Sequence, residues 1–303
     1  YRSHADILKV SSELFYGGQL EEYGSRETVD ALLTWPGISS CQSSSLSLSS
    51  STASTASNTT GSRPHFPLLF IGSDGPHFHE LDSPSFSNPT EAESVCQLCE
   101  LLLQGDEGKN LGILSSDIGV IVAFRAQVLL LRSIMRSRGL ASINIGEVED
   151  FQGQEVRIAI VCLVLSSRVP NMEINGSLGL LGDHRRFNVS VTRGKALVLV
   201  VGNPTVALSD VYWRKLIEHC YLHDSYQGVE CPQLHSHMST ITSNSFLHQR
   251  EREKELENEE ELLNTITRVA ILGGGDRERD RNNLSSLSLE QYYRRDIEWR
   301  LML

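Results

Sequence analysis

The chain has 303 residues, and 40% of them are hydrophobic, which supplies enough apolar material for a buried core and excludes a wholly disordered protein. Its formal net charge of −11 argues against a free-standing nucleic-acid-binding module, because neutralising phosphates requires clustered Lys and Arg. Any contact with nucleic acid is therefore expected to be local. Six cysteines without regular spacing indicate free thiols in a reducing compartment, and no apolar run is long enough to span a bilayer.

The predicted elements alternate between helices and buried strands. Apolar residues at helical spacing cover residues 5–16 and 27–34, and a buried strand is expected over 66–72. Asn88 is suited to cap a helix that Pro89 opens and that runs to about residue 104. The pattern continues with a strand over 117–124, a helix over 125–138, β-like runs over 141–145 and 156–165, and further alternation to residue 222. This order predicts an α/β fold with a mostly parallel sheet and helices on both faces.

Two stretches do not fit a packed domain. Residues 41–63 form a Ser/Thr tract too poor in apolar groups to pack, and we expect a disordered insertion there, with a regulatory phosphorylation segment as the alternative. Residues 234–303 are expected to be a charged, largely disordered tail with a possible helix over 249–263. The domain itself is therefore predicted to span residues 1–233.

Two groups of residues have spacings that resemble metal sites. Cys96 and Cys99 lie inside an apolar helical run, where buried thiols act as small hydrophobic side chains. The second group lies at the end of the domain and comprises His219, Cys220, His223, Cys231, His235 and His237. No second ligand pair has zinc spacing, so no metal site is predicted.

Three polar segments carry the chemistry. Residues 185–195 place cations at a helix end just before a buried strand, and Arg193 is a rigid, always charged fork suited to a transferring phosphoryl group. An arginine at such a position is otherwise an ordinary ion-paired surface residue. Residues 146–155 read as a polar turn between two strands. The third segment is Tyr1-Arg2-Ser3-His4, which leads into the first helix.

In this order the three segments resemble the second RecA-like lobe of superfamily one RNA helicases of the Upf-one-like group. The similarity is greatest to the Mov-ten/Armitage branch, because Leu178-Gly179-Leu180-Leu181 precedes the arginine block and Val201-Gly202-Asn203-Pro204 follows it. It covers residues 1 to about 233. The first segment begins in the middle of its motif, so we expect the chain to be a fragment.

The resemblance implies a RecA-like fold of the P-loop NTPase type and ATP-driven movement along single-stranded RNA. In such helicases the phosphate loop and the ligands of Mg²⁺ lie on the first lobe, and no Gly-x-x-x-x-Gly-Lys-Ser/Thr motif occurs in this chain. The resemblance therefore implies a missing N-terminal lobe, ATP with Mg²⁺, and single-stranded RNA as partners. It also implies ribonucleoprotein or RNA-silencing partners, no membrane, and a cytoplasmic location with ribonucleoprotein granules as one option.

The family's site residues carry over onto matching positions. Arg2 and Arg193 would be paired arginine fingers, and Glu155 would accept a hydrogen bond from the ribose, the alternative being an ordinary capping acid at a strand start. Gly153 would let the backbone approach the nucleotide, with Gln154 supporting that loop. Tyr1 would line the nucleotide pocket, or else be a frayed terminal residue. Arg186 and Thr192 are expected to fix the arginine block through hydrogen bonds.

Some positions depart from the family pattern. Where the family has Ser-Thr-Val-Arg-Ser after the Gln-Gly-Gln-Glu turn, this chain has Cys162-Leu163-Val164-Leu165-Ser166, so Leu163 and Leu165 replace a hydroxyl and an arginine near the expected RNA channel. The residue after the second finger is Gly194 instead of Ala. The alternative function is therefore a diverged, ATPase-poor lobe that acts as an interaction scaffold in a ribonucleoprotein.

Overall fold

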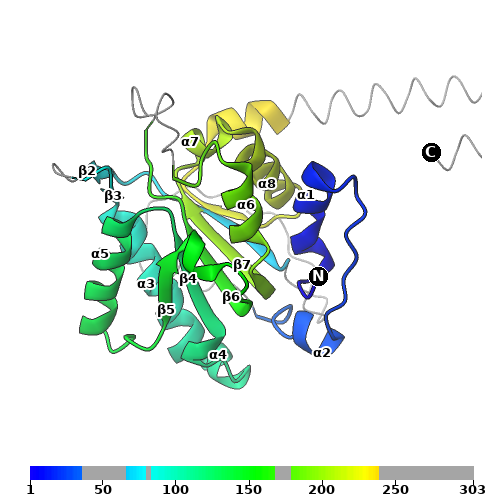
Figure 1. Cartoon of the computed structure of the whole chain (residues 1–303), viewed down its shortest axis with the longest axis horizontal. Coiled ribbons are helices and arrows are strands. Elements are labelled where there is room, and N and C mark those ends of the chain that lie inside the picture. Colours follow the sequence, from blue (N-terminus) through cyan, green and yellow to red (C-terminus); the bar gives the residue numbers. More distant parts are fainter. Residues whose placement is uncertain (36–65, 80–82, 168–178, 239–303) are drawn as a thin grey trace, which may run out of the picture. The chain divides into compact units, whose positions relative to one another are not determined.

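A computed structural model describes residues 1–35, 66–79, 83–167 and 179–238. A six-stranded sheet lies at its centre, and every strand in that sheet is parallel to its neighbours (Figure 1). The strand order is β5-β4-β6-β7-β1-β8. The bounds are β1 (Leu68–Gly72), β4 (Ile118–Val122), β5 (Asn144–Glu147), β6 (Val156–Cys162), β7 (Gly194–Gly202) and β8 (Tyr226–Gly228). The predicted α/β fold with a mostly parallel sheet of RecA-like type is thus confirmed.

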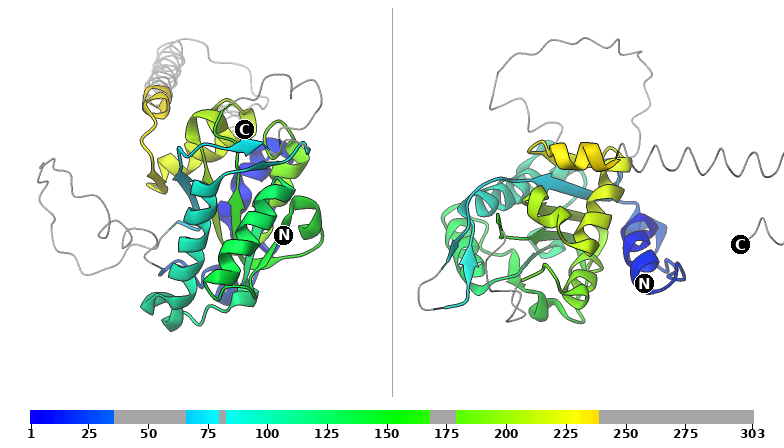
Figure 2. Two further views of the ribbon diagram at one scale, coloured as in Figure 1. Left: turned by 90° about the vertical axis from the view of Figure 1, so that its left-hand side faces the viewer. Right: turned by 90° about the horizontal axis from the view of Figure 1, so that it is seen from above.

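Helices cover both faces of the sheet. On one face α3 (Pro89–Gln104) packs against α5 (Arg125–Ser137), while on the other α1 (Ala5–Phe15), α6 (His184–Val191) and α8 (Val211–Leu222) contact one another (Figures 1 and 2). The central strands read as continuous apolar runs because both of their faces are buried. The short elements are α2 (Arg26–Val29), α4 (Asp106–Asn110), α7 (Pro204–Leu208), the 3₁₀ turns η2 (Ser115–Asp117) and η3 (Val148–Phe151), and the antiparallel pair β2 (Phe78–His79) and β3 (Phe86–Ser87).

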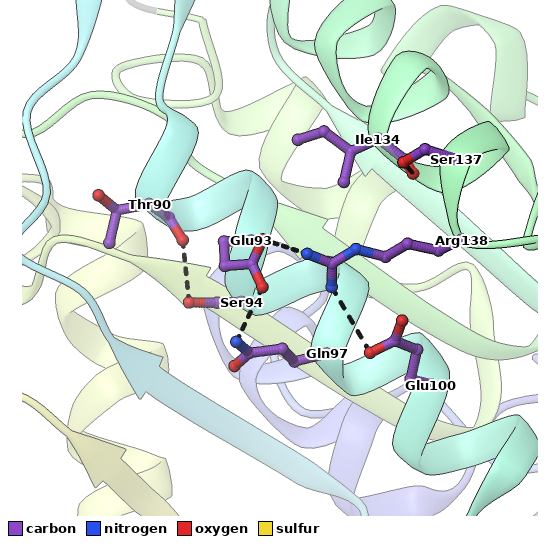
Figure 3. A network of polar contacts seen from close by, with 8 residues as sticks. All are labelled: Thr90, Glu93, Ser94, Gln97, Glu100, Ile134, Ser137 and Arg138. Carbon is purple, nitrogen blue, oxygen red and sulfur yellow. Dashed lines mark hydrogen bonds and ion pairs between the residues drawn. The ribbon is translucent and has the colours of Figure 1, made fainter. Parts of the chain in front are cut away.

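The interface between α3 and α5 contains a local charge network (Figure 3). Arg138, the residue that follows α5, places its guanidinium 2.5 Å from a carboxylate oxygen of Glu93 and 3.5 Å from one of Glu100, both on α3. The hydrogen bond from Arg138 lowers the pKa of Glu93 below its ordinary value. The start of α3 is as predicted, because the Asn88 side chain accepts a hydrogen bond from the Glu91 amide and Pro89 opens the helix.

The connection from β5 to β6 is short and runs across the sheet. Phe151 in η3 is fully buried, and a Cβ atom on Gly119 of β4 would lie 2.7 Å from its ring. Gly119 therefore leaves the space that Phe151 fills. The interpretation of residues 146–155 as a polar turn was wrong in part, because Gly146 and Glu147 belong to β5 and both Val148 and Phe151 are buried.

Several element boundaries differ from the sequence-based ones. The helix expected over 27–34 is confined to α2, and Trp35 precedes a proline, a position that disfavours helical backbone. The strand expected over 156–165 ends at Cys162, because Val164 adopts a left-handed backbone with a φ of 73°. The run expected over 141–145 becomes a strand only from Asn144, after a turn in which the Ile143 amide bonds to the Leu140 carbonyl.

The expected domain boundary at residue 233 falls within a stretch of helix over 232–238. The Ser/Thr tract at 41–63 and the possible helix over 249–263 lie outside the described residues. In the part of the chain that the structure describes, no helix combines the length and apolar character needed to cross a bilayer.

Candidate functional site

The N-terminal segment Tyr1–His4, called the strap below, docks beside the start of β7. The His4 amide donates a hydrogen bond to the Lys195 carbonyl at 2.9 Å, and the Ser3 hydroxyl donates to the Thr192 carbonyl at 3.4 Å. The His4 side chain accepts from the Asp6 amide and so caps α1. These contacts bring the first and third sequence motifs together across almost the whole length of the domain.

Arg193 lies between the end of α6 and the start of β7. Its Nε donates to the Val189 carbonyl at 3.1 Å, its Nη1 to the Gln154 carbonyl at 3.0 Å and its Nη2 to the Thr192 hydroxyl at 3.2 Å. A cation at a helix C-terminus is favoured by the helix dipole. The guanidinium is thus held between the helix end and the Gln-Gly-Gln-Glu loop (residues 152–155).

Glu155 is shared between two cations. Its Oε2 lies 3.6 Å from Nη1 of Arg2 and 3.4 Å from Nζ of Lys195. The Arg2 side chain is 71% exposed, whereas that of Lys195 is 26% exposed. Solvent screens the Arg2 pair, so it contributes little to stability and leaves Arg2 free to move.

The loop at residues 152–155 combines a fixed backbone with an open surface. Gly153 has a φ of +76°, in the left-handed region that favours glycine, and a Cβ built on it would meet nothing within 4 Å. The Gln154 side-chain amide donates to the Asp150 carbonyl at 2.7 Å. The glycine therefore serves the turn, and the position that a side chain would take there is open.

Tyr1 takes part in a small aromatic contact. Its hydroxyl lies 3.3 Å from that of Tyr16, and Asn188 of α6 donates to the same Tyr16 hydroxyl at 3.0 Å. Tyr1 is 43% exposed, so one part of its ring faces solvent. The bonds expected of Arg186 and Thr192 are present: the Thr192 hydroxyl donates to the Asn188 carbonyl, and Arg186 pairs with Glu149 at 2.6 Å.

Arg2, Glu155, Arg193 and Lys195 gather at the amino ends of β6 and β7. Val156 opposite Gly194 marks this edge, and the Val156 amide donates to the Arg193 carbonyl at 3.0 Å. Open α/β sheets usually bind ligands at the carboxyl ends of their strands. The cluster around Glu155 lies at the opposite edge.

A buried polar network at the carboxyl end of β6 was not predicted from the sequence. The Glu91 carboxylate accepts from the Val164 amide at 2.8 Å and from the Cys162 thiol at 3.1 Å, while Asn88 donates to Glu91 and to the Val164 carbonyl. The Gln127 side chain bonds both backbone groups of Asn88. Full burial raises the pKa of Glu91 to about 7. The only signal in the sequence was the Asn-x-x-Glu capping pattern at the start of α3.

The positions that depart from the family pattern belong to the core. Leu163 and Leu165 are each 1% exposed, and Leu163 packs against Gly202. Among the described residues no group of three or more His, Cys, Asp or Glu side chains is arranged to hold a metal ion. Burial raises the pKa of the Cys96 thiol to about 11 and that of Cys99 higher still, so both thiols stay protonated at neutral pH.

Comparison with known proteins identifies the family. The model of the AAA domain family matches residues 1–205. The human protein named RNA helicase Mov10l1 is 34% identical over 232 residues, an alignment that covers 77% of this chain and 17% of that protein. The zebrafish (Danio rerio) putative helicase mov-10-B.1 is 31% identical over 243 residues, which cover 77% of this chain and 22% of that protein.

A third relative, the probable RNA helicase armi of Drosophila melanogaster, is 34% identical over 167 residues, covering 55% of this chain and 14% of that protein. The chain thus spans about a fifth of the length of the first two relatives. The family match extends over the strap, the loop at residues 152–155 and the arginine block, the three segments that meet at the amino ends of β6 and β7. The chain belongs to the AAA domain family and, within it, to the Upf1-like RNA helicases.

Proposed function

We propose that the chain is the second RecA-like lobe of an ATP-dependent RNA helicase and that Arg2 and Arg193 act as its arginine fingers. One observation carries the proposal. Arg2 and Arg193 come from opposite ends of the domain, yet one pairs with Glu155 and the other donates to the carbonyl of Gln154, its neighbour in the loop. Two forked cations beside one open loop suit the charge on a transferring phosphoryl group.

The residues present fit a nucleotide. Arg2, Arg193 and Lys195 supply positive charge, a Cβ on Gly153 would meet nothing within 4 Å, and the Glu155 carboxylate would accept a hydrogen bond from a ribose hydroxyl. Tyr1 offers a half-open aromatic face at the border of the same region. ATP with Mg²⁺ supplies the phosphoryl group, and the phosphate loop and magnesium ligands are assigned to the missing first lobe.

The hydrogen bonds of Arg193 and the ion pair of Arg2 suggest how the two arginines act. Arg193 is fixed by three hydrogen bonds to groups of this lobe, so its guanidinium is preorganised, while Arg2 is exposed and weakly held. Closure of the two lobes would bring both to the γ-phosphate and exclude water. Charge stabilisation would then exist only in the closed state, which couples hydrolysis to movement along RNA.

The RNA side of the proposal rests on the relatives, several of which are named as RNA helicases. This lobe would form part of a channel for single-stranded RNA and act with ribonucleoprotein or RNA-silencing proteins in the cytoplasm or its granules. The alternative, an ATPase-poor scaffold lobe, is favoured by one observation: Leu163 and Leu165 lie in the core where the family has a hydroxyl and an arginine.

The fingers are tested by replacing Arg2 or Arg193 with Lys in the full-length protein. Lysine keeps the charge but loses the planar fork, so we expect kcat for RNA-stimulated ATP hydrolysis to fall by roughly 10³-fold while KM for ATP stays nearly constant. Steady-state ATPase assays at saturating RNA measure both constants.

Arg185→Lys is the matched control. Arg185 is exposed on α6, and its side chain makes no hydrogen bond or ion pair within the described residues. It should keep wild-type kcat. Equal kcat in wild type and both finger variants would exclude the finger assignment and favour the scaffold function over the ATPase function.

A further inference from the structure

A β-bulge, seen as a shift in the register between β6 and β7, interrupts β7 directly after Gly194. Val156 of β6 pairs with Gly194, but Ile158 pairs with Leu197, so Lys195 and Ala196 together oppose the single residue Arg157. Bulges of this kind occur next to functional sites, where the extra residue redirects a side chain and frees a backbone group from the ladder. The bulge falls at the edge of the sheet where the strap and the loop at residues 152–155 meet.

Gly194 is tightly enclosed on the N-terminal side of the bulge. A Cβ on Gly194 would lie 2.6 Å from the Leu197 carbonyl oxygen and 2.6 Å from a methyl of Val198. Real Cβ atoms do not approach other atoms that closely, so the backbone fits only a residue without a side chain. Gly194, which stands where the family has Ala, therefore permits the backbone conformation that leads into Lys195.

Lys195 contacts both other parts of the site. Its carbonyl accepts the amide of His4, which holds the strap and thereby Arg2 beside β7. Its Nζ lies 3.4 Å from Oε2 of Glu155, the same oxygen that lies 3.6 Å from Arg2. Lys195 is also the more enclosed partner, with 26% of its side chain exposed against 71% for Arg2.

We infer that Lys195 is a positioning residue for nucleotide binding: it holds the Glu155 carboxylate in place for the ribose when Arg2 leaves that carboxylate for the phosphate. The inference rests on the proposed function. In the proposed function the exposed Arg2 side chain turns to the phosphate, so finger engagement weakens one of the two cation contacts of Glu155. Lys195 then keeps the carboxylate oriented, because the backbone of Lys195 is fixed by the bulge and by its hydrogen bond with His4.

The test uses the full-length protein and steady-state hydrolysis of ATP and of its 2′-deoxy and 3′-deoxy analogues. Lys195→Gln is expected to raise KM for ATP about 10-fold with kcat within about twofold, which corresponds to a lost hydrogen bond to a charged group. The preference for ATP over the analogue whose missing hydroxyl Glu155 contacts should fall by a similar factor. Lys195→Arg, which keeps the charge, should restore most of that preference.

A double-mutant cycle separates positioning from a general structural effect. In a Glu155→Gln background, Lys195→Gln should change KM and the ATP preference little, since the carboxylate on which it acts is gone. A fall in kcat with the ATP preference unchanged would overturn the inference, as would equal losses for ATP and both analogues. Equal KM and kcat of the wild-type protein for all three nucleotides would exclude both the ribose role of Glu155 and this inference. The finger assignment would still be tested separately by kcat of Arg193→Lys.

Discussion

Glu91 carries a fully buried carboxyl group at the start of α3. It supports Val164, whose left-handed backbone is unfavourable for a β-branched side chain. Both backbone groups of Val164 are held, the amide by Glu91 and the carbonyl by Asn88. Strain of this type persists only where surrounding contacts impose it, and it concentrates at sites that position other groups.

The stability of the chain should therefore depend on the protonation of Glu91. Burial raises its pKa from 4.5 to about 7, so the folded state binds this proton more tightly than the unfolded state. The stabilisation is complete below the unfolded pKa and is lost as the pH rises through the folded one. Between about pH 4.5 and about pH 8, the free energy of unfolding of wild type should fall by about 3 kcal/mol relative to Glu91→Gln. Urea denaturation of both proteins across this range measures the difference, and parallel curves would contradict it.

The sequence identified some site residues and missed others for physical reasons. Arg193 and Glu155 stand in motifs whose order is readable along the chain, and the structure brings them to one loop. Lys195 owes its place to a bulge. Glu91 on α3 owes its environment to burial beside the end of β6, where its partners Cys162 and Val164 lie 71 and 73 positions further along the chain. Neither feature leaves a periodic signal, and the Asn-x-x-Glu pattern indicates the cap at the start of α3 but not the burial of the Glu91 carboxyl group.

At the scale of elements, the crossover from β5 to β6 depends on one glycine. Replacing Gly119 with Ala would press a methyl group against the ring of Phe151 and the side chain of Val156, at 2.7 and 3.0 Å. Overpacking of this kind costs about 1 to 3 kcal/mol. We expect the free energy of unfolding of Gly119→Ala, measured by urea denaturation, to fall by that amount.

The smaller side chain of Phe151→Leu supplies the matched test of this contact. Because the ring is the first atom group that the new methyl meets, the double variant should lose less stability than the sum of the two single variants. Strict additivity would show that the two residues do not share this space.

Most helices and strands could be predicted from the sequence, but the residues at which they end could be predicted less well. The Asn88-Pro89 start of α3 follows from capping chemistry that is local. The end of β6 does not, because residues 163–165 are as apolar as the strand and only their tertiary contacts turn the backbone away. The helix expected over residues 27–34 likewise ends early, at Val29, and a turn follows it.

For the whole molecule, we expect the isolated chain to hydrolyse no ATP. It contains the proposed arginine fingers, but no Gly-x-x-x-x-Gly-Lys-Ser/Thr loop to hold the phosphates and magnesium. A coupled-enzyme ATPase assay on the purified chain, with and without RNA, measures turnover. Robust activity that disappears in Arg193→Ala would contradict the two-lobe architecture, whereas activity restored by adding a lobe with that loop would support it.

The strand order also bears on how the chain is made. Strand β1 is the first strand of the sheet to leave the ribosome, yet its two neighbours, β7 and β8, are the last, and Leu68 pairs with Val198. Until residue 202 has been synthesised, β1 has neither neighbour, although its residues are suited only to a buried position. Unpaired apolar strands aggregate, and pairings between distant segments form slowly. We therefore expect the apolar residues of β1 to remain unpaired in nascent chains until β7 has been made.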